Sequence, residues 1–336
     1  MPRKLSDIAA GTGLALWTVG PGQAELREAR PAAPAAGEVT VRALVSGISR
    51  GTESLVFQGL VPESEWNRMR CPHQGGAFPF PVKYGYALVG EIEAQGEGVS
   101  GRLGQRVFSL HPHQSRLNLP AQAAMPVPAR VSTARAALVP QMETALNALW
   151  DGAPGKGARV AVVGGGVIGL LTAYLCRRLA KAEVVLVDVN PARAGVAAAL
   201  GLPFAAPDEA PRECDLIFHA SGSAEGLNLA LDLGAFEATV IELSWYGDKL
   251  TPVRLGGAFH SRRLTLRASQ VGAVSPAKRA RWDHARRLGK ALSLCADPAL
   301  DALVDRETPL AQIADRYGQI LSDPATLFHL IRYPEA

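Results

Sequence analysis

AVVGGGVIGLL, residues 161–171, is the stretch that decides the fold. An apolar strand, Val160–Val163, leads into Gly164, and a helical stretch, Leu170–Leu179, follows the last glycine of the motif. A second apolar strand, Val184–Val187, ends at Asp188, about twenty residues further on. This order of strand, glycine turn, helix and strand closed by an acidic residue predicts a doubly wound domain that binds a dinucleotide.

Each glycine of the motif has a physical role in such a domain. Gly164 permits the tight turn after the strand, Gly166 lets the backbone approach a pyrophosphate, and Gly169 lets the helix pack closely on the strand. The helix N-terminus, at Val167 and Ile168, offers free N–H groups and a partial positive charge to the phosphates.

Asp188 predicts which dinucleotide is bound. Its carboxylate should accept hydrogen bonds from both hydroxyls of the adenosine ribose and repel the 2′-phosphate of NADP, which favours NAD. Arg193, five residues further on, could weaken that exclusion. The alternative is a doubly wound domain that binds no nucleotide.

The rest of the chain falls into stretches of different pattern. Short β-type runs separated by turn residues predict a compact all-β unit over residues 14–130. Residues 135–270 alternate short apolar strands with helical stretches, which predicts a parallel sheet wrapped by helices. Residues 276–296 have the pattern of one amphipathic helix, and residues 301–336 that of a strand, a helix and a final strand. The predicted strands are Leu14–Val19, Glu38–Ser46, Tyr86–Glu93, Arg106–Leu110, Leu216–His219, Val240–Leu243, Leu264–Ala268 and Leu327–Arg332. The segment Leu60–Pro81 reads as a long surface loop.

Composition narrows the class of protein. The 336 residues are 48% hydrophobic and 20% charged, as in ordinary globular proteins. No apolar run is long enough for a membrane helix, and Met1–Gly13 lacks the apolar stretch of a signal peptide. The four cysteines are scattered without metal-ligand spacing, which suits a reducing compartment. We therefore expect a cytoplasmic protein with no membrane partner.

The most basic stretch is KRARWDHARR, Lys278–Arg287. It carries five Lys or Arg residues, but the net charge of the chain is only +4. We interpret this stretch as a solvated helix face rather than a phosphate-binding surface, and predict no nucleic-acid partner.

Several motifs together resemble the medium-chain dehydrogenase/reductase superfamily. They are GKGARV at 155–160, Val41–Gly59 with its SGI turn at 46–48, Gly85–Gly98, GQRV at 104–107 and ASG at 220–222. The resemblance implies an α/β protein with a GroES-like catalytic domain, residues 1–135 and 275–336, and an inserted Rossmann coenzyme domain, residues 136–274. It also implies an active site in the cleft, and a homodimer or homotetramer formed through Leu264–Ala268.

The sequence departs from the zinc enzymes of that superfamily at the matching positions. Ser49 stands where the first Cys ligand belongs, Tyr86 replaces the His and Ala87 the Glu of a Gly-His-Glu motif. The third ligand falls near Pro140 or Gln141. These are poor zinc ligands and the four-cysteine lobe is absent, so we predict no metal and a zinc-free branch. The SGISRGTE and GY motifs are similar to those of bacteriochlorophyllide a dehydrogenase, but two short motifs do not identify a substrate.

Without a metal, side chains must exchange the proton that accompanies hydride transfer. His111 is the first candidate because it follows a strand that lines the substrate pocket in the superfamily, although it could equally just hold the loop beside Pro112. Tyr86 is the second, either as a hydrogen-bond donor or as a filler of the space that the metal left. Ser49 and Glu53 rank third, with Glu53 as a residue that could orient His111 or Tyr86. His113 is expected to point elsewhere.

Three further residues are assigned to the cofactor. Thr144 begins a helical stretch where the superfamily often has a Thr against the nicotinamide ring. Ser221 and Trp245 follow strands whose carboxyl ends should hold the ligand, although Trp245 could instead be a core residue.

The sequence therefore predicts a zinc-independent oxidoreductase that uses NAD(H) and acts on a small-molecule alcohol or carbonyl substrate. A quinone or enoyl reductase of the same superfamily is one alternative. A nucleotide-binding protein without turnover is the other.

Overall fold

The chain folds into two compact units. In the computed structural model, which describes residues 13–334, one unit comprises Met1–Pro140 and Val304–Ala336, and the other Gln141–Leu303. The predicted absence of a signal peptide concerns residues that lie almost wholly outside the described part. Between residues 13 and 334, no helix is both long and apolar enough to cross a membrane.

The first unit is rich in β-structure. It has a four-stranded sheet of order β2-β1-β5-β4 and a seven-stranded sheet of order β16-β17-β3-β6-β7-β9, in which β8 also pairs with β3. Its strands are β1 (Leu14–Gly20), β2 (Gln23–Glu28), β3 (Glu38–Gly47), β4 (Gly75–Gly76), β5 (Val82–Lys83), β6 (Leu88–Gln95), β7 (Arg106–Ser109), β8 (Arg116–Pro120), β9 (Met125–Pro126), β16 (Val304–Pro309) and β17 (Phe328–Arg332). Its helices are α1 (Arg50–Gln58), α2 (Thr133–Ala136) and α8 (Leu310–Ser322).

The C-terminal tail belongs to this unit because it completes the hydrophobic core. Strand β17 pairs antiparallel with β3, and α8 buries one apolar face in the same cluster as the inward-facing residues of β3. Leu310, Ile313 and Ile320 supply that face. The predicted strand, helix and final strand of the tail are thus confirmed.

The second unit holds one parallel sheet of order β12-β11-β10-β13-β14-β15. This is the order of a doubly wound fold, in which the chain winds one way from β10 and the other way from β13. Its strands are β10 (Arg159–Val163), β11 (Glu183–Val187), β12 (Phe204–Ala205), β13 (Cys214–His219), β14 (Gly234–Glu242) and β15 (Thr265–Ala268). Its helices are α3 (Val139–Gly152), which starts just before the unit boundary, α4 (Val167–Leu175), α5 (Arg193–Ala199), α6 (Ala224–Leu233) and α7 (His284–Leu294).

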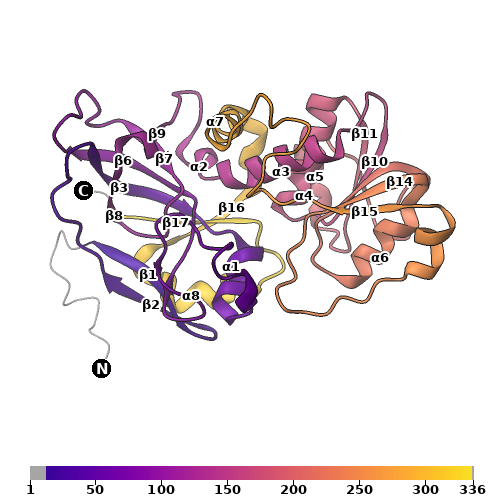
Figure 1. Ribbon diagram of the computed structural model, residues 1–336, viewed down its shortest axis with the longest axis horizontal. Helices are drawn as coiled ribbons and strands as arrows, with labels where there is room; N and C mark the ends of the chain where they lie inside the picture. The colour runs from indigo at the N-terminus through magenta and orange to yellow at the C-terminus, as the bar shows by residue number, and fades with distance from the viewer. Residues whose placement is uncertain (1–12, 335–336) are drawn as a thin grey trace. The chain divides into compact units, whose positions relative to one another are not determined.

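The local sequence explains why the central strands and their helices form. Strand β10 is RVAVV and buries its last four residues, as expected for a strand covered on both faces. Right-handed crossovers in opposite directions put α4 and α6 on opposite faces of the sheet (Figure 1). The point where the winding reverses, between β10 and β13, is where doubly wound folds bind their ligands.

Two expectations about residues 275–303 need correction. The helix predicted over 276–296 begins only at α7, where Asp283 caps it by accepting a hydrogen bond from Arg286 N. The segment also groups with the second unit, not with the first. The physical reason is Arg287, which is 1% exposed rather than solvated and donates to Glu143 Oε1 at 2.9 Å and Asn147 Oδ1 at 2.5 Å on α3.

Candidate functional site

The glycine turn of the second unit is built as its sequence suggests. Gly164 has φ +111°, and a Cβ there would lie 2.6 Å from the backbone of Ala220 and Ser221. A Cβ at Gly169 would lie 1.8 Å from the carbonyl oxygen of Gly164. Only glycine fits at these two positions. Gly164 lets the turn pack against the end of β13, and Gly169 lets α4 pack against the turn.

The N-terminus of α4 is open in front of that turn. Its N-cap is Gly166, which has no side chain to satisfy the first N–H groups, and a Cβ there would meet nothing within 4 Å. Val167 and Ile168 follow in the first helical turn and are half-buried. Free N–H groups, a helix dipole and open space suit a phosphate group.

The carboxylate of Asp188 is fixed beside the same turn. Its Oδ2 accepts a hydrogen bond from Gly165 N at 2.5 Å, and its Oδ1 accepts one from Asn190 N at 2.7 Å. Arg193 is 6% exposed and lies next to it, since a Cβ at Gly165 would be 3.1 Å from both Asp188 Oδ2 and Arg193 Cγ. Each carboxylate oxygen keeps a lone pair, so Asp188 can still accept from a ribose hydroxyl.

The other predicted cofactor residues belong to the same unit. Ser221 follows β13 and is exposed, and Trp245 follows β14 and is half-buried, so it is not part of the closed core. Thr144 is half-buried on α3. On the same helix Gln141 is 4% exposed, and neither atom of its amide has a hydrogen-bond partner among the described residues.

Sequence reasoning missed a polar cluster at the carboxyl ends of β13 and β14. His219 Nδ1 lies 2.8 Å from Glu242 Oε2, and His219 Nε2 lies 2.6 Å from Ser221 Oγ. Tyr246 donates to Glu242 Oε2 at 3.1 Å. The signal was available, because His219 and Glu242 are polar residues that end two neighbouring parallel strands and are paired in register.

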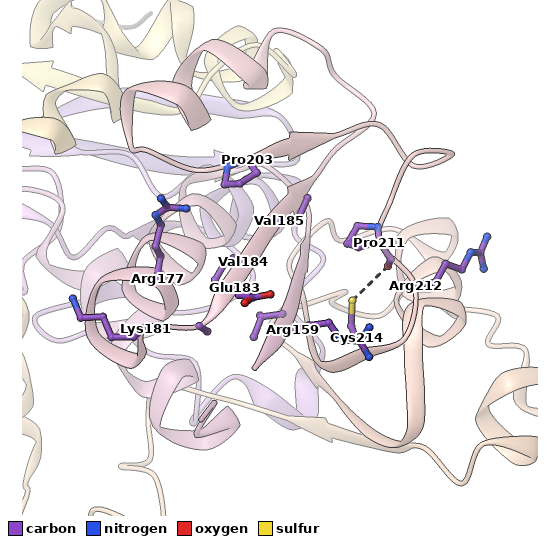
Figure 2. Close-up of a pocket in the computed structure, with 12 residues that line it drawn as sticks. Arg159, Arg177, Lys181, Glu183, Val184, Val185, Pro203, Pro211, Arg212 and Cys214 are labelled. Carbon is purple, nitrogen blue, oxygen red and sulfur yellow. Dashed lines mark hydrogen bonds between the residues drawn. The ribbon is translucent and has the colours of Figure 1, made fainter. Parts of the chain in front are cut away.

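A hollow at the opposite edge of this sheet does not fit a dinucleotide. It lies at the amino ends of β10, β11 and β13 and is lined by apolar residues together with five charged ones (Figure 2). The charged residues are Arg159, Arg177, Lys181, Glu183 and Arg212. Ligands of doubly wound folds bind at the carboxyl ends instead, so we do not assign the cofactor here.

In the first unit, the predicted residue Glu53 bonds to His113 rather than to His111 or Tyr86. His113 Nε2 lies 2.9 Å from Glu53 Oε2, and His113 Nδ1 lies 2.7 Å from Ser46 Oγ. Tyr317 also donates to Glu53 Oε2. Because a carboxylate only accepts, His113 Nε2 carries the proton toward Glu53.

This cluster is sealed from solvent. Ser46 and His113 are 0% exposed and Glu53 is 1% exposed. Burial alone would raise the pKa of Glu53, but His113 and the hydrogen bonds to the carboxylate lower it overall. The network therefore positions its neighbours, since Glu53 Oε1 accepts from Ser49 N at 2.7 Å at the start of α1. Its partners are too far apart in the sequence for local patterns to reveal them.

His111 is buried in a different way. It is 4% exposed, and its ring stacks on that of His73 with centroids 5.1 Å apart. Burial lowers the pKa of His111 to about 3, and its Nδ1 donates to the carbonyl of Pro112 at 2.9 Å. His111 is therefore neutral at physiological pH and has no proton to donate from a charged ring. This geometry favours the reading of His111 as a residue that holds its loop.

The structure does bring Tyr86 and Ser49 together. Burial raises the pKa of Tyr86 to about 12, while Ser49 and Thr52 lie close enough to its hydroxyl to oppose that rise. Both side chains are half-buried. Tyr86 therefore keeps its proton at neutral pH and can donate a hydrogen bond.

The residues present do not fit a zinc ion. Ser49 and Tyr86 offer only neutral hydroxyl groups, which bind zinc poorly compared with thiolate, imidazole and carboxylate. Over residues 13–334, no three His, Cys, Asp or Glu side chains are grouped so that they could hold a metal ion. Zinc independence itself stays a prediction.

The chain resembles dehydrogenases in sequence over part of its length. No family model matches it. The L-threonine 3-dehydrogenase of Edwardsiella ictaluri (strain 93-146) is 28% identical over 206 residues. That match covers 51% of this chain and 60% of the relative, so the chain spans about three fifths of the relative's length.

Solved structures resemble the chain over nearly all of its length. The 2R,3R-butanediol dehydrogenase of Bacillus subtilis has a TM-score of 0.75 at 18% identity, covering 96% of this chain and 100% of its own. A short chain alcohol dehydrogenase from E. coli CFT073 complexed with NADH has a TM-score of 0.74, with the same identity and coverage. A candidate zinc-binding dehydrogenase from Sinorhizobium meliloti 1021 bound to NADP also has a TM-score of 0.74, at 18% identity and with 96% and 100% covered.

These likenesses confirm the predicted fold class. The chain is an α/β protein with a GroES-like β-rich unit and a Rossmann unit, the fold of the medium-chain alcohol dehydrogenases. At such low identity they do not identify the reaction that this chain performs.

Proposed function

We propose that this protein is an NAD(H)-dependent oxidoreductase that interconverts a secondary alcohol and a carbonyl compound without zinc. The observation that carries the proposal is the second unit's glycine turn, where the open N-terminus of α4 and the carboxylate of Asp188 lie side by side. The relative that is a dehydrogenase and the similar structures with NADH or NADP support it.

The second unit would hold the cofactor through groups that are already in place. The first turn of α4 would bind the pyrophosphate, and Asp188 would accept from the adenosine ribose. When bound, nicotinamide accepts or supplies the hydride. A carboxylate at Asp188 favours NAD over NADP, because a 2′-phosphate there would meet a like charge.

The first unit would supply the proton-handling groups. Tyr86 is protonated at neutral pH, so its hydroxyl can donate to a carbonyl oxygen as negative charge develops there. Ser49 lies close enough to the Tyr86 hydroxyl to lower its pKa, and in this proposal it passes a proton to Tyr86. His113 and Glu53 do not contact the substrate in this proposal. They fix the backbone of Ser49.

Cofactor binding tests the first half of the proposal. Isothermal titration should show one NADH site per chain with weaker binding of NADPH. Asp188→Ala should weaken NADH binding by about 10- to 100-fold, since hydrogen bonds to a charged group are each worth about 1.5–3 kcal/mol. Asp208→Ala, which removes an exposed carboxylate from the same unit, is the control. Equal binding of NADH by both variants would refute the assignment of Asp188.

Turnover tests the second half. A panel of ketones and aldehydes, with quinones and enones beside them, should show NADH oxidation on the carbonyl compounds. Tyr86→Phe should lower kcat by about 100-fold, since a positioned acid typically contributes 10²- to 10⁴-fold. Tyr84→Phe removes a neighbouring hydroxyl, bonded to the Met69 carbonyl at 3.0 Å, and should leave kcat nearly unchanged. Preferred reduction of enones would favour the C=C reductase instead.

A further inference from the structure

At the carboxyl edge of the second unit's sheet, hydrogen bonds connect a serine to a histidine and that histidine to a glutamate. We call this the open series. Ser221 Oγ lies 2.6 Å from His219 Nε2, and His219 Nδ1 lies 2.8 Å from Glu242 Oε2. His219 ends β13 and Glu242 ends β14, and the register pairs them directly. The pairing of two central strands therefore fixes the histidine and the carboxylate.

The protons of this series follow from the chemistry of its members. A carboxylate can only accept, so His219 Nδ1 carries the hydrogen that binds Glu242. The lone pair of the neutral ring is then on Nε2, where it accepts the O–H of Ser221. This is the order of groups that activates a serine: a nucleophile, a base, and a carboxylate that orients the base.

Glu242 is held in the ionised state that this role needs. Besides His219, it accepts hydrogen bonds from Tyr246 OH at 3.1 Å and from Ser244 N at 2.7 Å. Burial alone would raise the pKa of Glu242, but the hydrogen bonds and His219 lower it overall. The carboxylate therefore stays charged at neutral pH and keeps the ring of His219 in one tautomer.

The first turn of α6 is shaped to fit the serine. A Cβ at Gly226 would lie 2.1 Å from Ser221 Oγ and 2.9 Å from His219 Nε2, so only glycine leaves room for the pair. Helix α6 begins at Ala224, and Ser223 caps it by accepting from Gly226 N at 3.0 Å, which leaves the N–H groups of Ala224 and Glu225 without an acceptor in the helix. Such groups beside a nucleophile can stabilise a developing oxyanion. Ser221 itself is exposed, so a small substrate can reach it.

We propose that Ser221, His219 and Glu242 form a second reactive centre, which hydrolyses small activated carboxylic esters. This inference goes beyond the proposed oxidoreductase function and does not depend on it. In contrast to the sealed Ser46–His113–Glu53 cluster, this series ends at an exposed residue, whose hydroxyl also lies 3.1 Å from Ser223 Oγ and accepts from Ser223 N at 3.3 Å.

The reaction balances with the ester and water as its only reactants. Ser221 Oγ attacks the ester carbonyl carbon while its proton passes to His219 Nε2. The bond from the carbonyl carbon to the leaving oxygen breaks, the alcohol departs with that proton, and an acyl-serine remains. Water then adds to the acyl carbon, gives one proton to His219, and releases the carboxylic acid as Ser221 recovers its hydrogen.

Hydrolysis of p-nitrophenyl acetate and labelling by a fluorophosphonate test this proposal on the whole chain. We expect release of p-nitrophenol above the rate in buffer, and a phosphonyl adduct that peptide mass spectrometry places on Ser221. Ser221→Ala should abolish the adduct and lower the rate of hydrolysis by about 100-fold, the scale of a positioned base and nucleophile. Because Ser221 is exposed, this variant should fold normally.

Two comparisons make the outcome decisive. Ser261→Ala removes an exposed serine whose hydroxyl only donates to the Gly257 carbonyl at 3.1 Å, and it should change neither readout. His219→Gln, checked for folding by circular dichroism, should lose labelling as fully as Ser221→Ala. An adduct on another residue, or hydrolysis that survives in Ser221→Ala, would overturn the proposal. So would the absence of any adduct on the folded parent protein.

Discussion

Each unit of this protein contains a buried histidine that lies between a glutamate, at one ring nitrogen, and a serine, at the other. In the first unit the pair is His113–Glu53 and the serine is Ser46. In the second unit the pair is His219–Glu242 and the serine belongs to the exposed turn after β13. The same three residue types thus form a closed structural network in one unit and an open one in the other.

The difference lies in where each series ends. Ser46 is 0% exposed, and its hydroxyl lies 2.8 Å from Tyr333 OH, so the chain of hydrogen bonds ends inside the protein. Ser221 is exposed, so the second series ends where a substrate or a cofactor can reach it. Residue identity alone therefore does not define a reactive site. The accessibility of the terminal hydroxyl decides between packing and chemistry.

The largest expected effect is on folding stability at the sealed pair. Glu53→Ala leaves the His113 and Tyr317 donors buried without an acceptor, so it should lower the free energy of unfolding by about 3–5 kcal/mol. Glu242→Ala should lower it by less, since water can reach a side chain that is 13% exposed. Urea unfolding followed by circular dichroism measures both variants. Equal losses would remove the distinction between the two pairs.

The glycines beside His113 and His219 should also differ in the stability that is lost when alanine replaces them. The larger loss is again expected beside the sealed cluster. Gly85 has φ +118°, and a Cβ there would lie 2.9 Å from His113 Nε2, so Gly85→Ala should cost about 1–3 kcal/mol of stability. Gly226→Ala on α6 should cost less than Gly85→Ala, because Gly226 has no positive φ and the exposed Ser221 side chain can rotate away, although the new Cβ would also lie 2.9 Å from the buried His219 Nε2. It should, however, abolish fluorophosphonate labelling. A Gly226→Ala variant that is labelled like the parent would contradict the geometry of the open series.

A third buried histidine, His111, donates to a backbone carbonyl instead of a carboxylate. Its folded pKa of about 3 lies below the usual 6.5, so the unfolded chain takes up this proton first as the pH falls. Stability should be complete above pH 6.5 and be lost between pH 6.5 and about 3, by about 2 kcal/mol at pH 5.

Unfolding free energies at pH 7 and pH 5 measure this loss. The His111→Gln variant should lose about 2 kcal/mol less than the parent between these two pH values. His284→Gln, at an exposed position, should lose as much as the parent. Parallel losses in the parent and His111→Gln would show that His111 is not buried in the neutral form.

The smallest effect is expected at an exposed ion pair. Arg332 donates to Glu307 at 3.0 Å, with side chains 50% and 54% exposed. Glu307→Gln should change the free energy of unfolding by less than about 1 kcal/mol, since exposed pairs are screened by solvent. A loss as large as that of Glu53→Ala would mean that burial is not what separates these carboxylates. Urea unfolding followed by circular dichroism measures the free energy of unfolding of Glu307→Gln against that of the parent.

The sequence predicted the parts of the molecule that depend on patterns between residues close to one another in the chain. The glycine turn, the strand before Asp188 and the parallel sheet all follow from patterns within about 30 residues. The partners of Glu53 were not predictable in this way, because Tyr317 is separated from it by 264 residues. His113 was expected to point elsewhere, whereas the structure places it at the centre of the sealed network.

Tertiary contacts also explain the expectations that failed in the second unit. Arg287 lies in a basic stretch that reads as solvated, yet its ion pair with Glu143 attaches residues 275–303 to the Rossmann unit. No local pattern shows that a helix 144 residues away supplies the carboxylate. The pairing of His219 with Glu242 was within reach of sequence reasoning, because His219 ends one predicted strand and Glu242 is the last residue but one of the next.

Carbonyl reduction by NADH, measured before and after treatment with a chelator and alongside the metal content of each sample, tests the central proposal most directly. We predict that activity persists at less than about 0.1 zinc per chain and falls by about 100-fold in Tyr86→Phe. Activity that disappears with stoichiometric zinc and returns on its addition would contradict the account.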